Sequence, residues 1–285
     1  MAHTQTWSTA PAEALRAADG FRLAQVDPRS TPGYHGDKKS AEADLAATTA
    51  RLGELQERLF AESTASPGTG SVLLVLQAMD TAGKGGIVRH VVGSVDPQGV
   101  ELAAFKKPTP DELAHDFLWR IRRRLPAAGR IGVFDRSHYE DVLIGRVRAL
   151  APPEEIERRY GAILGFEREA ADRGIRIVKV MLHISKDEQK ARLAERLDRP
   201  DKHWKFAPGD LDERALWDEY MTAYEVAIQR TSTADAPWFV VPADRKWYAR
   251  LAVAQLLVDA LAGLDPQWPP ADYDVAAERA RLAAS

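Results

Sequence analysis

The sequence predicts an α/β fold in which helices cover a parallel sheet of five strands. Two observations predict it. Short apolar runs alternate with segments of helical length, and strands separated by helices form parallel sheets. The run VLLVLQ at 72–77 is apolar without alternation, which is typical of a strand buried on both faces. The length of 285 residues allows one large domain with a substantial core.

The elements follow in order along the chain. Residues 1–36 are rich in Pro, Gly, Ser, Thr and Ala without a clear period, and we expect an extended arm. Leucines at helical spacing predict a helix over 38–62. The strands are expected at 72–77, 100–105, 131–134, 175–184 and 238–241. Further helices are expected at 110–125, from 152 to about 173, from 185 to about 197, at 211–231 and at 246–261, two of them starting in capping boxes. The domain then spans 37–265, and 266–285 is an Ala-rich tail.

Composition excludes several classes of protein. There is no cysteine, so disulfides, thiolate metal sites and thiol catalysis are excluded. No apolar run approaches the roughly 18 residues of a membrane helix, and the N-terminus shows no signal pattern. We therefore expect a cytoplasmic enzyme with no membrane partner. The net charge of −3 argues against an indiscriminate nucleic-acid binder.

The strongest motif is AMDTAGKGG at 78–86, between a buried strand and a helix. This context indicates a phosphate-binding loop, in which backbone N–H groups surround phosphate oxygens and Lys84 adds a positive charge. The loop departs from the general pattern because Gly85 replaces the hydroxyl residue that holds Mg²⁺. Asp80 is the substitute ligand, since a carboxylate beside phosphates needs a bridging cation. The alternatives are a tight turn with a chance lysine and, for Asp80, a helix cap.

A second acidic site follows the strand at 131–134. Asp135 at the strand end is the Walker-B arrangement, which brings a carboxylate to the sheet edge that carries the phosphate loop. Arg136 would clamp the transferred phosphate. Asp135 as a mere helix cap is the alternative. Glu140 and Asp141 either face the nucleotide or are first-turn helix charges. His138 is expected to be a structural group or to hydrogen-bond to substrate, and not to shuttle protons, because phosphoryl transfer needs little acid–base catalysis.

Two segments are locally basic although the chain is acidic. Residues 104–148 hold 10 basic and 6 acidic side chains, and residues 186–205 hold 7 against 5. Turn formers mixed with cations after residue 199 suit a mobile lid that closes over phosphates. An ordinary charged helix and loop is the alternative.

These motifs together resemble the polyphosphate kinase 2 family over residues 30–265. The residues that carry the resemblance are QAMDTAGKGG at 77–86, DPQG at 96–99, FKKPT at 105–109, FDRSHYEDVL at 134–143, the segment 196–206, Trp217, Tyr220 and APW at 236–238. The resemblance implies a three-layer α/β/α P-loop kinase-like fold with a helical lid at about 190–212. It also implies Mg²⁺-dependent, reversible transfer of a phosphoryl group from inorganic polyphosphate to AMP or ADP, with Mn²⁺ as an alternative metal.

The resemblance also assigns roles to residues. Asp80, Lys84, Asp135 and Arg136 would be catalytic, the two aspartates by holding the metal. Phosphate and polyphosphate would be bound by Ala82, Gly83, Gly85, Gly86, Arg89, Lys106, Lys107, Arg196, Arg199, Lys202 and Lys205. The nucleotide, of adenine or alternatively guanine, would meet His138, Tyr139, Glu140 and Asp141, a segment similar to the subgroup that accepts both AMP and ADP. The family suggests a homo-oligomer, a dimer or a tetramer.

Two other functions compete with this one. An ATP-dependent nucleoside or nucleotide kinase of the same fold would need fewer cations than Lys106, Lys107 and the lid provide. A non-catalytic phosphate-binding regulator would not need both Asp80 and Asp135.

Overall fold

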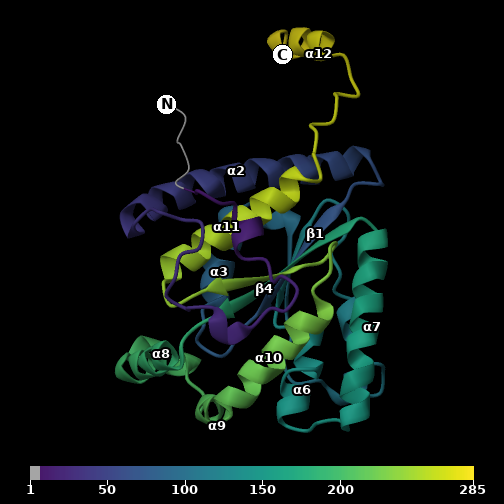
Figure 1. Ribbon diagram of the computed structural model, residues 1–285. Helices are drawn as coiled ribbons and strands as arrows, with labels where there is room; N and C mark the ends of the chain where they lie inside the picture. Colours follow the sequence, from purple (N-terminus) through teal and green to yellow (C-terminus); the bar gives the residue numbers. More distant parts are fainter. Residues whose placement is uncertain (1–6) are drawn as a thin grey trace.

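A computed structural model describes residues 7–285, and five parallel strands form its centre (Figure 1). The strands are β1 (Ser71–Gln77), β2 (Val100–Ala104), β3 (Ile131–Asp135), β4 (Ile175–His183) and β5 (Trp238–Pro242). Their order in the sheet is β2-β3-β1-β4-β5, and every neighbouring pair is parallel. The predicted fold class and all five predicted strands are confirmed.

Helices cover both faces of the sheet (Figure 1). One layer holds α2 (Lys38–Ala65), α3 (Lys84–His90) and α11 (Lys246–Ala262). The other holds α6 (Ile144–Val147), α7 (Pro153–Asp172) and α10 (Trp217–Thr231). The shorter or projecting helices are α1 (Pro11–Ala14), α4 (Pro110–Leu113), α5 (Trp119–Arg122), α8 (Lys186–Asp198), α9 (Gly209–Ala215) and α12 (Val275–Ala283). Within residues 7–285, no helix combines the length and apolar character that crossing a membrane requires.

Two predicted helices are each broken in two. The segment predicted as one helix over 110–125 forms only the single turns α4 and α5. Between them, the Asp116 carboxylate accepts a hydrogen bond from the Leu118 N–H at 3.0 Å, which competes with the helical bonding pattern. The segment predicted over 211–231 is interrupted at Leu216, whose N–H donates to the Glu213 carbonyl one residue short of an α-helical bond.

The N-terminal arm, described from residue 7, lies along the edge strand β5. The Ala17 N–H donates to the Trp238 carbonyl, and the Val240 N–H donates to the Leu15 carbonyl, both at 2.9 Å. Further along the arm, the Trp7 ring packs edge-on against Tyr34 at a centroid distance of 5.0 Å. The arm thereby covers backbone groups that an edge strand would otherwise expose.

An ion pair is buried in the layer between β4 and α7. The Lys179 ammonium donates to the Glu167 carboxylate at 2.6 Å and to the Thr231 carbonyl at 2.7 Å. Burial opposes the charge on Glu167, but Lys179 and His138 beside it outweigh burial and lower the pKa of Glu167. The Tyr139 hydroxyl also donates to Glu167, at 2.7 Å. This network fixes the chain just after β3 to the core.

Breaking this pair on one side is expected to be costly. Lys179→Met leaves Glu167 buried without its cation, and we expect the free energy of unfolding to fall by about 3–5 kcal/mol. The double variant Lys179→Met/Glu167→Gln keeps hydrogen-bonding atoms but removes both charges, and should recover at least half of that loss. Urea denaturation of the three proteins measures both effects. A double variant as unstable as the single one would contradict this account.

The imidazole of His183, at the end of β4, gives the stability a pH dependence. Burial lowers the pKa of His183 to about 4, against 6.5 for an ordinary histidine. Between these two values the unfolded chain binds a proton that the folded chain does not, so the free energy of unfolding falls as the pH falls. The full loss is about 3 kcal/mol.

A His183→Gln variant should therefore lose less stability than the parent chain between pH 7 and pH 4.5. Urea denaturation at the two pH values measures the difference. Equal losses in the two proteins would show that another group carries this part of the pH dependence.

Candidate active site

The phosphate loop connects β1 to α3 with two residues in the left-handed region. Thr81 has a φ of 67° and Gly83 a φ of 120°. The second value is strained for any residue with a side chain, which explains the glycine. Lys84 opens α3 and its ammonium donates to the Ala78 carbonyl across the loop at 2.9 Å. The loop therefore holds its lysine beside backbone N–H groups at a helix start, as an anion site requires.

The second acidic motif lies beside this loop because β3 pairs with β1. Leu76 is opposite Asp135 in the register. The next residue, Arg136, has a φ of 64°, and its N–H donates to the Leu76 carbonyl at 3.1 Å. The Arg136 guanidinium donates to the Asp80 carboxylate at 3.0 Å. Asp80, Asp135 and Arg136, which belong to two motifs some 55 residues apart in sequence, thus share one place at the carboxyl edge of the sheet.

An open cleft of about 870 Å³ unites most of the predicted residues. Those that line it are Asp80, Ala82, Gly83, Lys84, Gly85, Gly86, Arg89, Lys106, Asp135, Arg136, Arg196, Lys202 and Lys205. Eight lysine and arginine side chains line the cleft against three aspartates. His90 also lines the cleft. Its pKa is lowered by burial and by the positive charges of Arg250 and Arg89.

Several lining residues were not predicted from the sequence: Thr81, His90, Phe105, Trp204, Asp210 and Arg250. Arg250 belongs to α11, a helix whose sequence is typical of an apolar core. The signal that could have revealed it is Lys246 one turn earlier, because two cations at i and i+4 share a face that the core does not use. Trp204 could have been suspected as an aromatic residue between Lys202 and Lys205.

Other predicted residues lie outside the cleft lining. Lys107 is exposed beyond the end of β2. Arg199 is absent from the cleft lining and pairs with Asp201 at 2.8 Å and Glu195 at 3.3 Å. Asp141 pairs with Arg159 at 3.3 Å. The predicted lid region therefore supplies Arg196, Lys202 and Lys205 to the cleft lining. Two of them are also paired, Arg196 with Asp210 at 3.2 Å and Lys202 with Glu195 at 2.5 Å.

His138 and Tyr139 are placed in the core, not in the cleft. Both side chains are fully buried, and both contact Glu167, His138 at 3.3 Å and Tyr139 at 2.7 Å. Neither ring can reach a nucleotide from there, so we correct the prediction of direct contact. Glu140 remains close to the site: burial raises its pKa, although Arg136 and Lys84 act in the opposite direction.

The cleft suits a metal that is held jointly with phosphate. Among residues 7–285, no group of three or more His, Asp or Glu side chains could hold a metal ion by itself. Asp80 and Asp135 are the acidic donors beside the phosphate loop. Mg²⁺ typically takes one or two carboxylates and completes its shell with substrate phosphates and water. The donor set thus fits Mg²⁺ that arrives with phosphate.

Helix α8 anchors the phosphate loop from outside. The Arg192 guanidinium is buried and donates to the carbonyls of Thr81 at 3.0 Å and Ala82 at 2.9 Å. Its other nitrogen donates to the Ala243 carbonyl at 2.6 Å. Gln189, one turn earlier, donates to the Asp80 carbonyl at 3.1 Å. The helix that leads into the cationic segment is therefore bonded directly to the loop.

Removing this anchor should loosen the loop. Arg192→Met leaves the loop carbonyls without their charged donor, and we expect a loss of about 3 kcal/mol in the free energy of unfolding. Amide hydrogen exchange at residues 80–86 should accelerate more than exchange in β1. Lys190→Met changes an exposed residue of the same helix and is the control. It should change neither the free energy of unfolding nor the amide exchange at residues 80–86. Unchanged exchange in the loop of Arg192→Met would contradict the anchoring role.

Comparison with known proteins gives one family throughout. The sequence model described as Polyphosphate kinase 2 matches residues 35–269. The chain is 50% identical over 249 residues to the AMP/ADP-polyphosphate phosphotransferase of Meiothermus ruber, covering 87% of this chain and 91% of the relative. It is 43% identical to the ADP-polyphosphate phosphotransferase of Rhodopseudomonas palustris, covering 86% of each. The crystal structure of Polyphosphate Kinase 2 from Arthrobacter aurescens TC1 superposes with a TM-score of 0.96, at 62% identity and over 100% of both chains.

Proposed function

The chain belongs to the polyphosphate kinase 2 family, and on that premise we propose that it transfers a phosphoryl group between inorganic polyphosphate and AMP or ADP. The observation that carries the proposal is the cleft at the carboxyl edge of the sheet, where Asp80 and Asp135 lie among eight cations. A triphosphate donor alone would not require so many positive charges. A long polyanion would, because each phosphate of the chain carries its own charge.

Each group has a role that follows from its place. Asp80 and Asp135 would hold Mg²⁺, which neutralises phosphate oxygens when bound. Arg136 donates to the Asp80 carboxylate and Lys84 to the Ala78 carbonyl of the same loop, and both cations would stabilise the charge that spreads over the transferred group. Arg89, Lys106 and Arg250 extend the positive lining away from the loop and would hold the chain of the donor. In such a transfer, holding the two reacting phosphates in line provides most of the rate acceleration.

The reaction needs no covalent intermediate on the protein. A terminal phosphate oxygen of AMP or ADP attacks the terminal phosphorus of polyphosphate in line. A new P–O bond forms as the bond to the rest of the chain breaks, and the shortened polyphosphate leaves with the electron pair. The attacking oxygen is already ionised at neutral pH, so no residue has to act as a general base.

We also propose that α8, the 3₁₀ turn at Pro200–Lys205 and α9 form the lid. Arg196, Lys202 and Lys205 project from this region into the cleft, and Figure 1 shows α8 and α9 standing out from the sheet layers. Closure would bring these cations onto the bound phosphates and exclude water from them.

The proposal is tested with purified protein, polyphosphate, MgCl₂ and either AMP or ADP. We expect formation of ADP or ATP, detected by ion-exchange chromatography. Asp80→Asn and Lys84→Ala should each lower the rate by at least about 100-fold, with little change in the melting temperature. Asp111→Asn and Lys190→Ala are matched controls outside the cleft and should remain active.

A second arm replaces polyphosphate by ATP as the donor. Phosphorylation of AMP by ATP with no use of polyphosphate would contradict the proposal and would favour an ATP-dependent nucleotide kinase.

A further inference from the structure

One aromatic side chain of the cleft has no role in the transfer described above. Trp204 lies in the 3₁₀ turn Pro200–Lys205 of the proposed lid and lines the cleft. Of the exposed large apolar residues within 7–285, it has the largest exposed fraction, 79%. A tryptophan can bury about 150–250 Å² of surface against a partner. The cleft therefore contains a large apolar surface that the protein itself leaves uncovered.

The turn that carries this ring is fixed to α8. The Arg196 guanidinium donates to the Lys205 carbonyl at 2.8 Å. The Trp204 indole N–H donates to the Asp201 carbonyl at 3.1 Å, and the Lys205 ammonium lies 4.8 Å from the centre of the indole ring. Because these contacts orient the ring before any ligand arrives, a ligand that binds to it loses little affinity to side-chain ordering.

Of the two proposed substrates, only the nucleotide has an apolar, planar group to place against an indole. Polyphosphate is charged along its whole length, whereas a nucleobase stacks on aromatic rings. Besides the His90 imidazole, the described lining contains one other aromatic ring, that of Phe105. Phe105 is buried and packs edge-on against Phe134 at a centroid distance of 5.0 Å. Trp204 is thus the aromatic surface that the cleft offers to a base.

The phosphate end of the nucleotide is expected at the floor of the cleft. Asp80, Lys84 and Arg136 lie there, at the carboxyl edge of the sheet. The base is at the opposite end of the nucleotide, so it extends away from these three groups toward the walls. The turn that carries Trp204 forms one of these walls.

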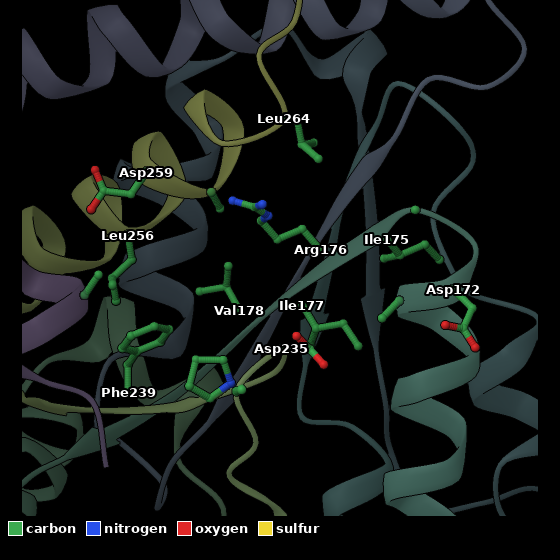
Figure 2. A pocket seen from close by; sticks show the side chains of 16 residues that line it. Asp172, Ile175, Arg176, Ile177, Val178, Asp235, Phe239, Leu256, Asp259 and Leu264 are labelled. Carbon is green, nitrogen blue, oxygen red and sulfur yellow. The ribbon is translucent and has the colours of Figure 1, made fainter. Parts of the chain in front are cut away.

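A second hollow of comparable size does not suit a nucleotide. It has a volume of about 680 Å³ and lies at the other edge of the sheet, where β4 and β5 begin (Figure 2). Its charged side chains are those of Asp172, Asp235, Asp259 and Arg176. A phosphate placed there would meet three carboxylates and a single guanidinium, and like charges repel. The catalytic cleft is therefore where the whole nucleotide, base included, finds complementary groups.

We propose that Trp204 stacks on the base of the acceptor nucleotide and so positions the nucleotide in the cleft. The inference rests on the proposed function, because the ligand is AMP or ADP. Stacking depends on the size of the base and involves no hydrogen bond to its edge. Trp204 would therefore favour purine over pyrimidine nucleotides and would not distinguish adenine from guanine.

The first test compares ligands with and without a base by isothermal titration calorimetry in MgCl₂. AMP should bind to Trp204→Ala about 10-fold more weakly than to the parent chain, and Trp204→Phe should recover most of the loss. Ribose 5-phosphate has the same sugar and phosphate but no base, so its affinity should not change. Tripolyphosphate should also keep its affinity. Trp268→Ala is the matched control, because Trp268 is 51% exposed and lies outside the cleft lining.

Two results of this titration would overturn the inference. One is an AMP affinity that Trp204→Ala leaves unchanged. The other is an equal weakening of AMP, ribose 5-phosphate and tripolyphosphate, because Trp204 would then act through the lid cations and not on the base.

A second measurement does not need the alanine variant. A base that stacks on an indole quenches its fluorescence, so AMP should quench the emission of the parent chain more than that of Trp204→Phe. Trp268→Phe should be quenched like the parent chain. Equal quenching of the parent chain and Trp204→Phe overturns the inference. Both tests measure binding without turnover. A parent chain that transfers phosphoryl groups but binds AMP independently of Trp204 would therefore contradict this inference and leave the proposed function intact.

Discussion

The parallel pairing of β1 with β3 is the constraint on which the site depends. Because Leu76 lies opposite Asp135, the chain leaves the sheet at the same level twice, once into the phosphate loop and once into the Asp135–Arg136 turn. The left-handed backbone at Arg136 is sterically costly, and such residues persist only where their surroundings hold them in place. Here the hydrogen bond to the Leu76 carbonyl fixes the N–H of Arg136. The buried network of Tyr139, Glu167 and Lys179 fixes the residues that follow Arg136.

The same constraint explains how an acidic protein can recognise a polyanion. The net charge is −3, yet the cleft gathers cations from α3, from the end of β2, from α8 and its following turn, and from α11. These elements are distant in sequence and meet only because parallel strands end at one edge. A focused positive cleft in an acidic body concentrates a polyanion at one place and repels it elsewhere.

The fold and the centre of the site could be predicted from the sequence, because both depend on local patterns. Each strand is an apolar run, and Asp80, Lys84 and Asp135 belong to short motifs next to such runs. The errors come from long-range contacts. Nothing local distinguishes His138 and Tyr139 from site residues, since their burial depends on Lys179 and Glu167, about 30–40 residues further on. Lys246 and Arg250 mark a polar face of α11 in the sequence, but which site that face lines depends on the packing of α11 beside α3. The break between α4 and α5 depends on one hydrogen bond, from the Leu118 N–H to the Asp116 carboxylate. An aspartate that accepts such a bond is equally typical of the first residue of a helix, so the sequence does not reveal the break.

The most direct test of the central claim, direct transfer between two phosphates aligned at this edge, is a rapid-quench single turnover with ³²P-labelled polyphosphate and excess enzyme. The account predicts that label passes from polyphosphate to AMP or ADP with no labelled protein at any time, with or without acceptor. Label on the protein that forms and decays at the rate of nucleotide formation would show a covalent relay and would contradict the account.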